Sequence, residues 1–178
     1  MDKTPLQIIC DTREQKPWTF ENYNVTVVRA GLRSGDYSLA GHEHEIALER
    51  KSLDDLVQSL SHGRTRFEAE IERLSAISFA AVLVEASAED VARHRYQSQM
   101  NPASVMQSMF SWTVRYRVPF LLCGSRRAAE YAAHGLLSKY QKHVEDREKE
   151  KQAVTYLEGL TAKRSASRKR EKEIPRGI

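Results

Sequence analysis

The first fifty residues group their apolar positions into short runs that predict strands. Runs at 6–10 and 25–29 have the length and β-branched content of strands. The segment 38–48 is apolar at both ends and polar around 40–45, which predicts a hairpin that turns in the polar part. The chain is therefore expected to begin with a small sheet.

The spacing of apolar residues changes after residue 52 and predicts helices that alternate with strands. Helices are expected over 53–60 and 67–74, at 101–116 and from Ser125 onward, with buried strands at 79–84 and 118–123. The chain thus begins with strands and then alternates helices with strands. This order indicates an α/β fold in which helices flank both faces of a mixed central sheet.

Composition narrows the class of protein. The chain has 178 residues, of which 40% are hydrophobic and 29% charged, as expected for one domain with a charged appendage. No apolar run approaches the ~20 residues that cross a bilayer, so no membrane is expected. No two of the eight glycines are spaced as GxG, which excludes dinucleotide-binding fingerprints. The two cysteines lie far apart in apolar runs and predict reduced thiols in a cytoplasmic protein.

Charge is distributed unevenly, and it predicts three regions. Residues 1–140 form the expected folded domain, 141–160 a charged helical extension, and 161–178 a flexible basic tail with seven basic and two acidic residues. The tail is either an arm that binds phosphates or a solvated segment that aids solubility. If it is an arm, its DNA-binding residues are Lys163, Arg164, Arg168, Lys169 and Arg170.

Acidic and basic residues gather near the predicted hairpin. Strand alternation places Glu49 and Lys51 on one face and Arg50 on the other, and Asp36 lies at the turn into the hairpin. Two carboxylates beside a lysine suit hydrolysis of a phosphodiester with a hard divalent cation, which prefers oxygen ligands. A solvated acid and lysine pair on a strand is the common alternative.

Other charged residues in this region have two interpretations each. Asp55 stands three residues after Ser52, a spacing that is typical of helix capping. Arg64 and Arg66 follow Gly63 between two predicted helices, where they either cradle a phosphate or pair with neighbouring glutamates.

The order of these residues resembles the XPF-type (ERCC4 domain) structure-specific endonuclease family. The family signature is GDx(n)ERKxxxD, and residues 35–64 read GDYSLAGHEHEIALERKSLDDLVQSLSHGR. An earlier DxRE element and a later GR element of the family are also matched. The matching residues are Gly35, Asp36, Glu49, Arg50, Lys51 and Asp55, with Asp11, Arg13 and Glu14 before them and Gly63 and Arg64 after them.

The resemblance implies a restriction-endonuclease-like core that cuts DNA with Mg²⁺ or Mn²⁺. It implies that Asp36 and Glu49 hold the metal with the carbonyl of Arg50, and that Lys51 acts on the attacking water. Asp11 and Glu14 would complete the acidic cluster. Arg13, Arg50 and Arg64 would meet phosphates or brace the site, and Asp55 would be the acid of the following helix; the catalytic set is Asp36, Glu49, Lys51, Arg50 and Asp11.

The expected function is therefore a metal-dependent DNA endonuclease that acts on branched, flapped or distorted duplexes in repair or recombination. The alternatives are a DNA-binding recruitment module that does not cut, and a restriction-type nuclease on the same core. Because these 178 residues contain no GxG pair, we do not expect them to include the tandem helix-hairpin-helix domain that is usual in the family. A homodimer through the apolar helix at 101–116 is a further expectation, as is a place at the bacterial nucleoid or in the cytoplasm of a phage host.

Overall fold

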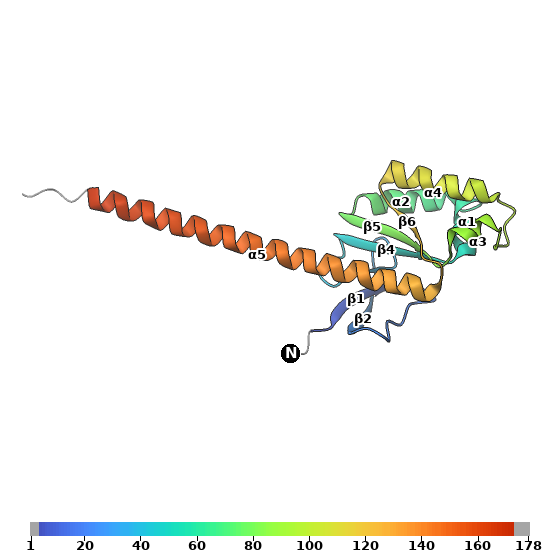
Figure 1. Ribbon diagram of the computed structural model, residues 1–178, viewed down its shortest axis with the longest axis horizontal. Coiled ribbons are helices and arrows are strands. Elements are labelled where there is room, and N and C mark those ends of the chain that lie inside the picture. Colours follow the sequence, from blue (N-terminus) through green and yellow to red (C-terminus); the bar gives the residue numbers. More distant parts are fainter. Residues whose placement is uncertain (1–3, 173–178) are drawn as a thin grey trace, which may run out of the picture. The chain divides into compact units, whose positions relative to one another are not determined.

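The computed structural model describes residues 4–172, with side chains up to residue 159 and at residue 161. Six strands form one mixed sheet in the order β2-β1-β3-β4-β5-β6 (Figure 1). The pairs β1/β2, β4/β5 and β5/β6 are parallel, and β3 pairs antiparallel with β1 and β4. The strands are β1 (Leu6–Asp11), β2 (Val25–Ala30), β3 (Tyr37–Leu39), β4 (Ile46–Lys51), β5 (Phe79–Val84) and β6 (Phe120–Leu122).

Helices cover both faces of this sheet. One face carries α1, α2 and α4, and the first turns of α5, residues 126–138, lie on the other (Figure 1). The helices are α1 (Leu53–Leu60), α2 (Arg64–Ser75), α3 (Ala88–Ala92), α4 (Pro102–Tyr116) and α5 (Arg126–Lys172). The predicted mixed sheet flanked by helices on both faces is confirmed.

The largest part of the core lies between the sheet and α1, α2 and α4. Alternate residues of β5, Ala80, Val82 and Val84, point to this side, where Phe67 of α2 and Trp112 of α4 are buried with them. Burial of such apolar surface contributes roughly 25 cal/mol per Å². The same packing fixes β4, which lies between β3 and β5, relative to α1 and α2.

Several elements differ from the sequence prediction. The short helix α3 was not predicted, although Ser87 and Asp90 form a complete capping box at its start. Strand β6 is a half-buried edge strand, whereas the sequence predicted a fully buried one. An edge position exposes one side of the strand, and apolar content alone does not reveal it.

The chain divides into two compact units, Met1–Ser138 and Lys139–Ile178. The predicted charged extension is helical and belongs to α5, which continues through the first part of the predicted basic tail. Side chains beyond residue 161 and all of residues 173–178 lie outside the described part of the chain, so the flexibility of the tail stays a prediction. Within the described residues, no helix is both long and apolar enough to cross a membrane.

Candidate active site

Asp36 stands where β1, β3 and β4 meet. Its backbone N–H donates to the carbonyl of Leu48 at 2.8 Å, and its carbonyl accepts from the N–H of Asp11 at 2.8 Å. The preceding Gly35 has a φ of +78°, and a Cβ there would lie 3.1 Å from the carbonyl oxygen of Leu48. A side chain at position 35 would therefore be both strained and crowded, and glycine lets the chain bring Asp36 against β4.

The Asp36 carboxylate faces β4. Its Oδ2 accepts a hydrogen bond of 2.8 Å from the backbone N–H of Arg50, and its Oδ1 makes no hydrogen bond within the described part of the chain. Burial raises the pKa of Asp36, and the nearby carboxylate of Glu14 raises it further, against the lowering effect of the Arg50 N–H. One oxygen is thus fixed in position, and the other is available to a ligand.

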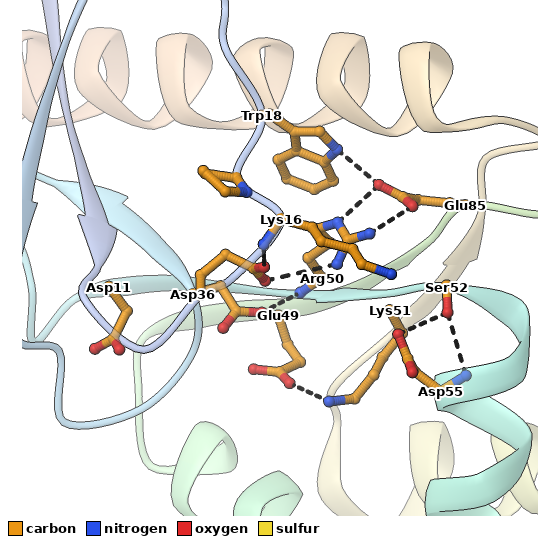
Figure 2. A network of polar contacts seen from close by, with 12 residues as sticks. Asp11, Lys16, Trp18, Asp36, Glu49, Arg50, Lys51, Ser52, Asp55 and Glu85 are labelled. Carbon is orange, nitrogen blue, oxygen red and sulfur yellow. Dashed lines mark hydrogen bonds and ion pairs between the residues drawn. The ribbon is translucent and has the colours of Figure 1, made fainter.

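Glu49 and Lys51 project from the same face of β4, as strand alternation predicted. The Nζ of Lys51 lies 2.6 Å from Oε1 of Glu49, while Oε2 of Glu49 is buried without a hydrogen-bond partner among the described residues (Figure 2). Burial and the charge of Asp36 raise the pKa of Glu49. A buried carboxylate oxygen without a partner is costly, which indicates that this side chain is arranged for a ligand.

Lys51 remains a cation in this setting. Burial would lower the pKa of its ammonium group, but the adjacent Glu49 carboxylate raises it, and the net shift is upward. The ammonium group also lies over the ring of Phe67, 4.9 Å from the ring centroid. Its charge and position are therefore held by both β4 and α2.

These side chains line one cavity of about 410 Å³. The cavity also contains Glu70 of α2, which the sequence suggested only as one of the glutamates that could pair with Arg64 and Arg66, and not as a site residue. Glu70 lies four residues after Arg66, so helical spacing places the two on the same face, and that was the available signal. The predicted site residues that line the cavity are Asp11, Arg13, Glu14, Asp36, Glu49, Arg50, Lys51, Asp55 and Arg66.

Asp11 has its carboxylate oxygens occupied. Its Oδ1 accepts from the backbone N–H and Nε of Arg13, at 2.7 and 2.8 Å, and its Oδ2 accepts from the N–H of Leu32 at 2.6 Å. Burial would raise the pKa of Asp11, but the hydrogen bonds from Arg13 and Leu32 hold it below its usual value. This arrangement is that of an acid that fixes the turn after β1.

Arg50 points to the opposite side of β4 from Glu49 and Lys51. Its Nε and Nη2 donate to the two oxygens of Glu85 at 2.8 and 2.7 Å, and its Nη1 lies 3.7 Å from Oε2 of Glu14 (Figure 2). Both Arg50 and Glu85 are almost fully buried. The guanidinium of Arg50 thus braces the sheet, and Glu14 takes part in that brace.

Glu85 is the second residue that sequence reasoning missed. It follows β5, and besides Arg50 it accepts hydrogen bonds from Nε1 of Trp18 and from Nη1 of Arg126, both at 2.9 Å. It therefore connects β4, β5 and the first turn of α5. Nothing in the local pattern around residue 85 marks it, because its partners lie 35 or more residues away.

Comparison with known proteins identifies the family of the chain. The ERCC4 domain model matches residues 10–134 of the chain. The chain belongs to the ERCC4 domain family. Among solved structures, XPF from Aeropyrum pernix is similar with a TM-score of 0.64 and 20% sequence identity, covering 79% of this chain and 67% of that one.

A second structure of XPF from Aeropyrum pernix, in complex with DNA, gives a TM-score of 0.61 at 23% identity, over 77% of this chain and 66% of that one. The ERCC4 domain thus spans about two thirds of the chains it resembles. The expected restriction-endonuclease-like fold is confirmed by these similarities. No curated protein matched the chain.

Two further residues that the sequence predicted for the site, Asp55 and Arg64, make contacts with side chains outside the cavity. Asp55 lines the cavity but also bonds to Oγ of Ser52, whose side chain caps α1, in agreement with the capping interpretation. Arg64 lies outside the cavity lining, because its Nη1 donates to Oγ of Ser108 at 3.1 Å and its guanidinium stacks over Trp112. The predicted basic side chains of the tail lie outside the described residues.

Proposed function

We propose that this ERCC4 domain hydrolyses phosphodiester bonds in DNA with the help of Mg²⁺ or Mn²⁺. The observation that carries the proposal is the grouping of Asp36, Glu49 and Lys51 in one cavity, with Oε2 of Glu49 buried and lacking a hydrogen-bond partner among the residues that the structure describes. In this grouping each of the two carboxylates uses one oxygen in the fold and leaves the other for a ligand, and a cation stands beside them.

The carboxylates fit a hard cation. Within the described side chains, no group of three or more histidine, cysteine, aspartate or glutamate residues is arranged to hold a metal. Mg²⁺ nevertheless needs only one or two carboxylates, because it keeps several of its waters. Asp36 and Glu49 would hold it through their free oxygens, while Asp11 and Glu14, engaged with Arg13 and Arg50, would shape the surroundings. A bound cation would polarise the phosphate and lower the pKa of a water.

Lys51 acts as a charge in this proposal. Since its pKa is raised, its ammonium group does not serve as a base at neutral pH. Instead it would orient the attacking water and balance the negative charge that develops on the phosphate oxygens. In the reaction the water oxygen bonds to phosphorus, one ester P–O bond breaks, and the leaving oxygen takes up a proton.

Exposed arginines beside the cavity support DNA as the substrate. The side chain of Arg13 is 71% exposed, and Arg66 is exposed on α2 at the cavity edge. Both would contact phosphates, and the basic residues of 161–178 would extend this surface. Such an enzyme would act at the nucleoid of a bacterium or in the cytoplasm of a phage host.

The test is a cleavage panel. Labelled flap, four-way junction, linear duplex and RNA substrates are incubated with the full chain and Mg²⁺. Cleavage of flap or junction DNA is expected. Binding without cleavage on every substrate would favour a recruitment module, and preferential cutting of linear duplex would favour a restriction-type nuclease.

A homodimer is a second proposal. On α4, Val105, Met109 and Trp112 are buried in the core, whereas Phe110 and Val114 are 53% and 80% exposed. The predicted excess of apolar residues is thus divided between two faces of this helix. Two exposed apolar side chains one turn apart suit a self-complementary contact. Light scattering on the protein and on Phe110→Glu tests it, and equal monomer mass for both would remove it.

A further inference from the structure

A second cavity lies beside α1, on a different face of that helix from Asp55. It has a volume of about 840 Å³ and is lined by residues along α1, by the two residues that follow it and by the loop between α3 and α4. We call it the amide cavity, after the three glutamines in its wall, Gln58, Gln97 and Gln99. Its size lies in the range of small-molecule sites.

The polar side chains of the amide cavity are amides, hydroxyls and one imidazole, with one exception. The three glutamine amides make no side-chain hydrogen bond within the described part of the chain, and His62 and Ser98 stand beside them. The exception is Asp54, whose Oδ1 accepts from the N–H of Gln97 at 2.9 Å. No lysine or arginine belongs to this lining as the structure describes it.

This chemistry suits a base better than a phosphate. Proteins bind phosphate through arginine, lysine or clustered N–H groups. Glutamine amides, in contrast, present one donor and one acceptor side by side, which matches the edges of nucleobases. Met100, which is half-buried, adds apolar surface for the face of a ring.

The loop wall of the cavity is already ordered. The hydroxyl of Tyr96 donates to the carbonyl of Met100 at 2.7 Å, and the N–H of Met100 donates to Oγ of Ser98 at 3.2 Å. The bond between Asp54 and Gln97 fastens the same loop to α1. A wall held in this way loses little entropy when a ligand enters, which favours binding.

The amide cavity borders the candidate active site through two consecutive residues. Asp54 lines the amide cavity, and Asp55 lines the cavity that contains Glu49 and Lys51. An α-helix with its side chains is ~10–12 Å across, and a stacked strand advances ~3.4 Å per nucleotide, so about three or four nucleotides span that width. A strand with its phosphate at Lys51 can thus place a nearby base beyond the first turn of α1.

We infer that the amide cavity holds an unpaired base of the DNA strand that is cut, within a few nucleotides of the cleaved phosphate. The inference rests on the proposed function and specifies its substrate, since a paired base presents no free Watson–Crick edge. The enzyme then requires at least one unpaired nucleotide near the cut.

The experiment compares base removal in the DNA with amide removal in the protein. Flap substrates carry either a normal base or an abasic site at each of the first few unpaired positions beside the duplex. The proteins are the full chain, the double variant Gln58→Leu/Gln99→Leu and the control Gln107→Leu, an exposed glutamine of α4. Binding is measured in Ca²⁺ and cleavage in Mg²⁺, and thermal melts check that the variants fold.

At one position, an abasic site is expected to weaken binding to the unaltered chain and the control by about tenfold or more. The double variant is expected to bind normal and abasic DNA equally. Equal binding of both DNAs by the unaltered chain, or unchanged base dependence in the double variant, would overturn the inference. If the unaltered chain cleaves none of the substrates, the proposed function is overturned. The binding measurements with normal and abasic DNA would still test whether the amide cavity holds a base.

Discussion

Glu49 and Lys51 form an ion pair on one face of β4, with 2.6 Å between Oε1 and Nζ. The pair uses one oxygen of Glu49 and leaves the other buried, with no hydrogen-bond partner in the described part of the chain. Its geometry therefore combines a fixed cation with an open ligand position. Asp36, directly before β3, adds a second open oxygen to the same cavity.

Removing either the ammonium group of Lys51 or the carboxylate of Asp36 should abolish cleavage and preserve DNA binding. Lys51→Ala and Asp36→Asn are each expected to lower the cleavage rate by roughly 10²-fold or more, since electrostatic stabilisation of developing charge has that size. Glu89→Gln, an exposed acid of α3, is the matched control. Activity retained in both site variants would remove the assignment.

Cation binding should become tighter as the pH rises toward neutrality. The pKa values of Asp36 and Glu49 are raised, so the folded protein binds protons there that a cation must displace. Calorimetry in buffers of different ionisation enthalpy is expected to detect proton release when Mg²⁺ binds. An affinity for Mg²⁺ that does not change between pH 5.5 and 8 would contradict the two carboxylates as ligands.

Asp11→Asn should destabilise the fold, because it leaves the N–H groups of Arg13 and Leu32 with a weaker acceptor. A loss of ~1–3 kcal/mol in the free energy of unfolding is expected from urea titration at pH 7. The pKa of Asp11 is lowered, so its contribution is present above its unfolded value of ~3.9 and disappears as the pH falls through the folded value. The difference from the unaltered protein should therefore shrink in acid, while Asp146→Asn in α5 should have little effect at any pH.

Glu85→Leu should be costly because it leaves Arg50 buried without its main partner. Breaking a buried ion pair from one side costs ~3–5 kcal/mol, whereas replacing both partners by apolar residues costs much less. The double variant Arg50→Met/Glu85→Leu is therefore expected to be more stable than Glu85→Leu alone. Additive losses in a double-mutant cycle would show that the pair is not coupled.

Deletion of residues 161–178 should weaken DNA binding and flatten its dependence on salt. Each phosphate contact contributes ~0.9 to the slope of log K against log[salt] on duplex DNA. Anisotropy titrations between 50 and 200 mM salt compare the two chains. If the slope of log K against log[salt] is the same for both chains, the basic residues of 161–178 do not contact DNA phosphates and serve solubility instead.

Sequence reasoning succeeded where a local pattern decides the geometry. The alternation of β4 placed Glu49 and Lys51 together, and the spacing from Ser52 to Asp55 identified the cap of α1. The sequence did not show that the carboxylate of Asp11 accepts hydrogen bonds from Arg13. That contact depends on the turn after β1, which brings the Arg13 side chain back to Asp11. Glu85 escaped notice for a different reason, since it acquires its role only when distant segments fold together.

The contacts of Arg126 bear on how short a working fragment of this protein can be made. Its guanidinium donates to Glu85 and to the carbonyls of Lys16 and Pro17, and the following turns of α5 bury Ala129 and Leu137. A fragment ended after β6 would leave a buried carboxylate undercompensated and one face of the sheet uncovered. The minimal unit for expression or domain fusion therefore extends beyond Leu137, and a fusion partner belongs on the later turns of the helix.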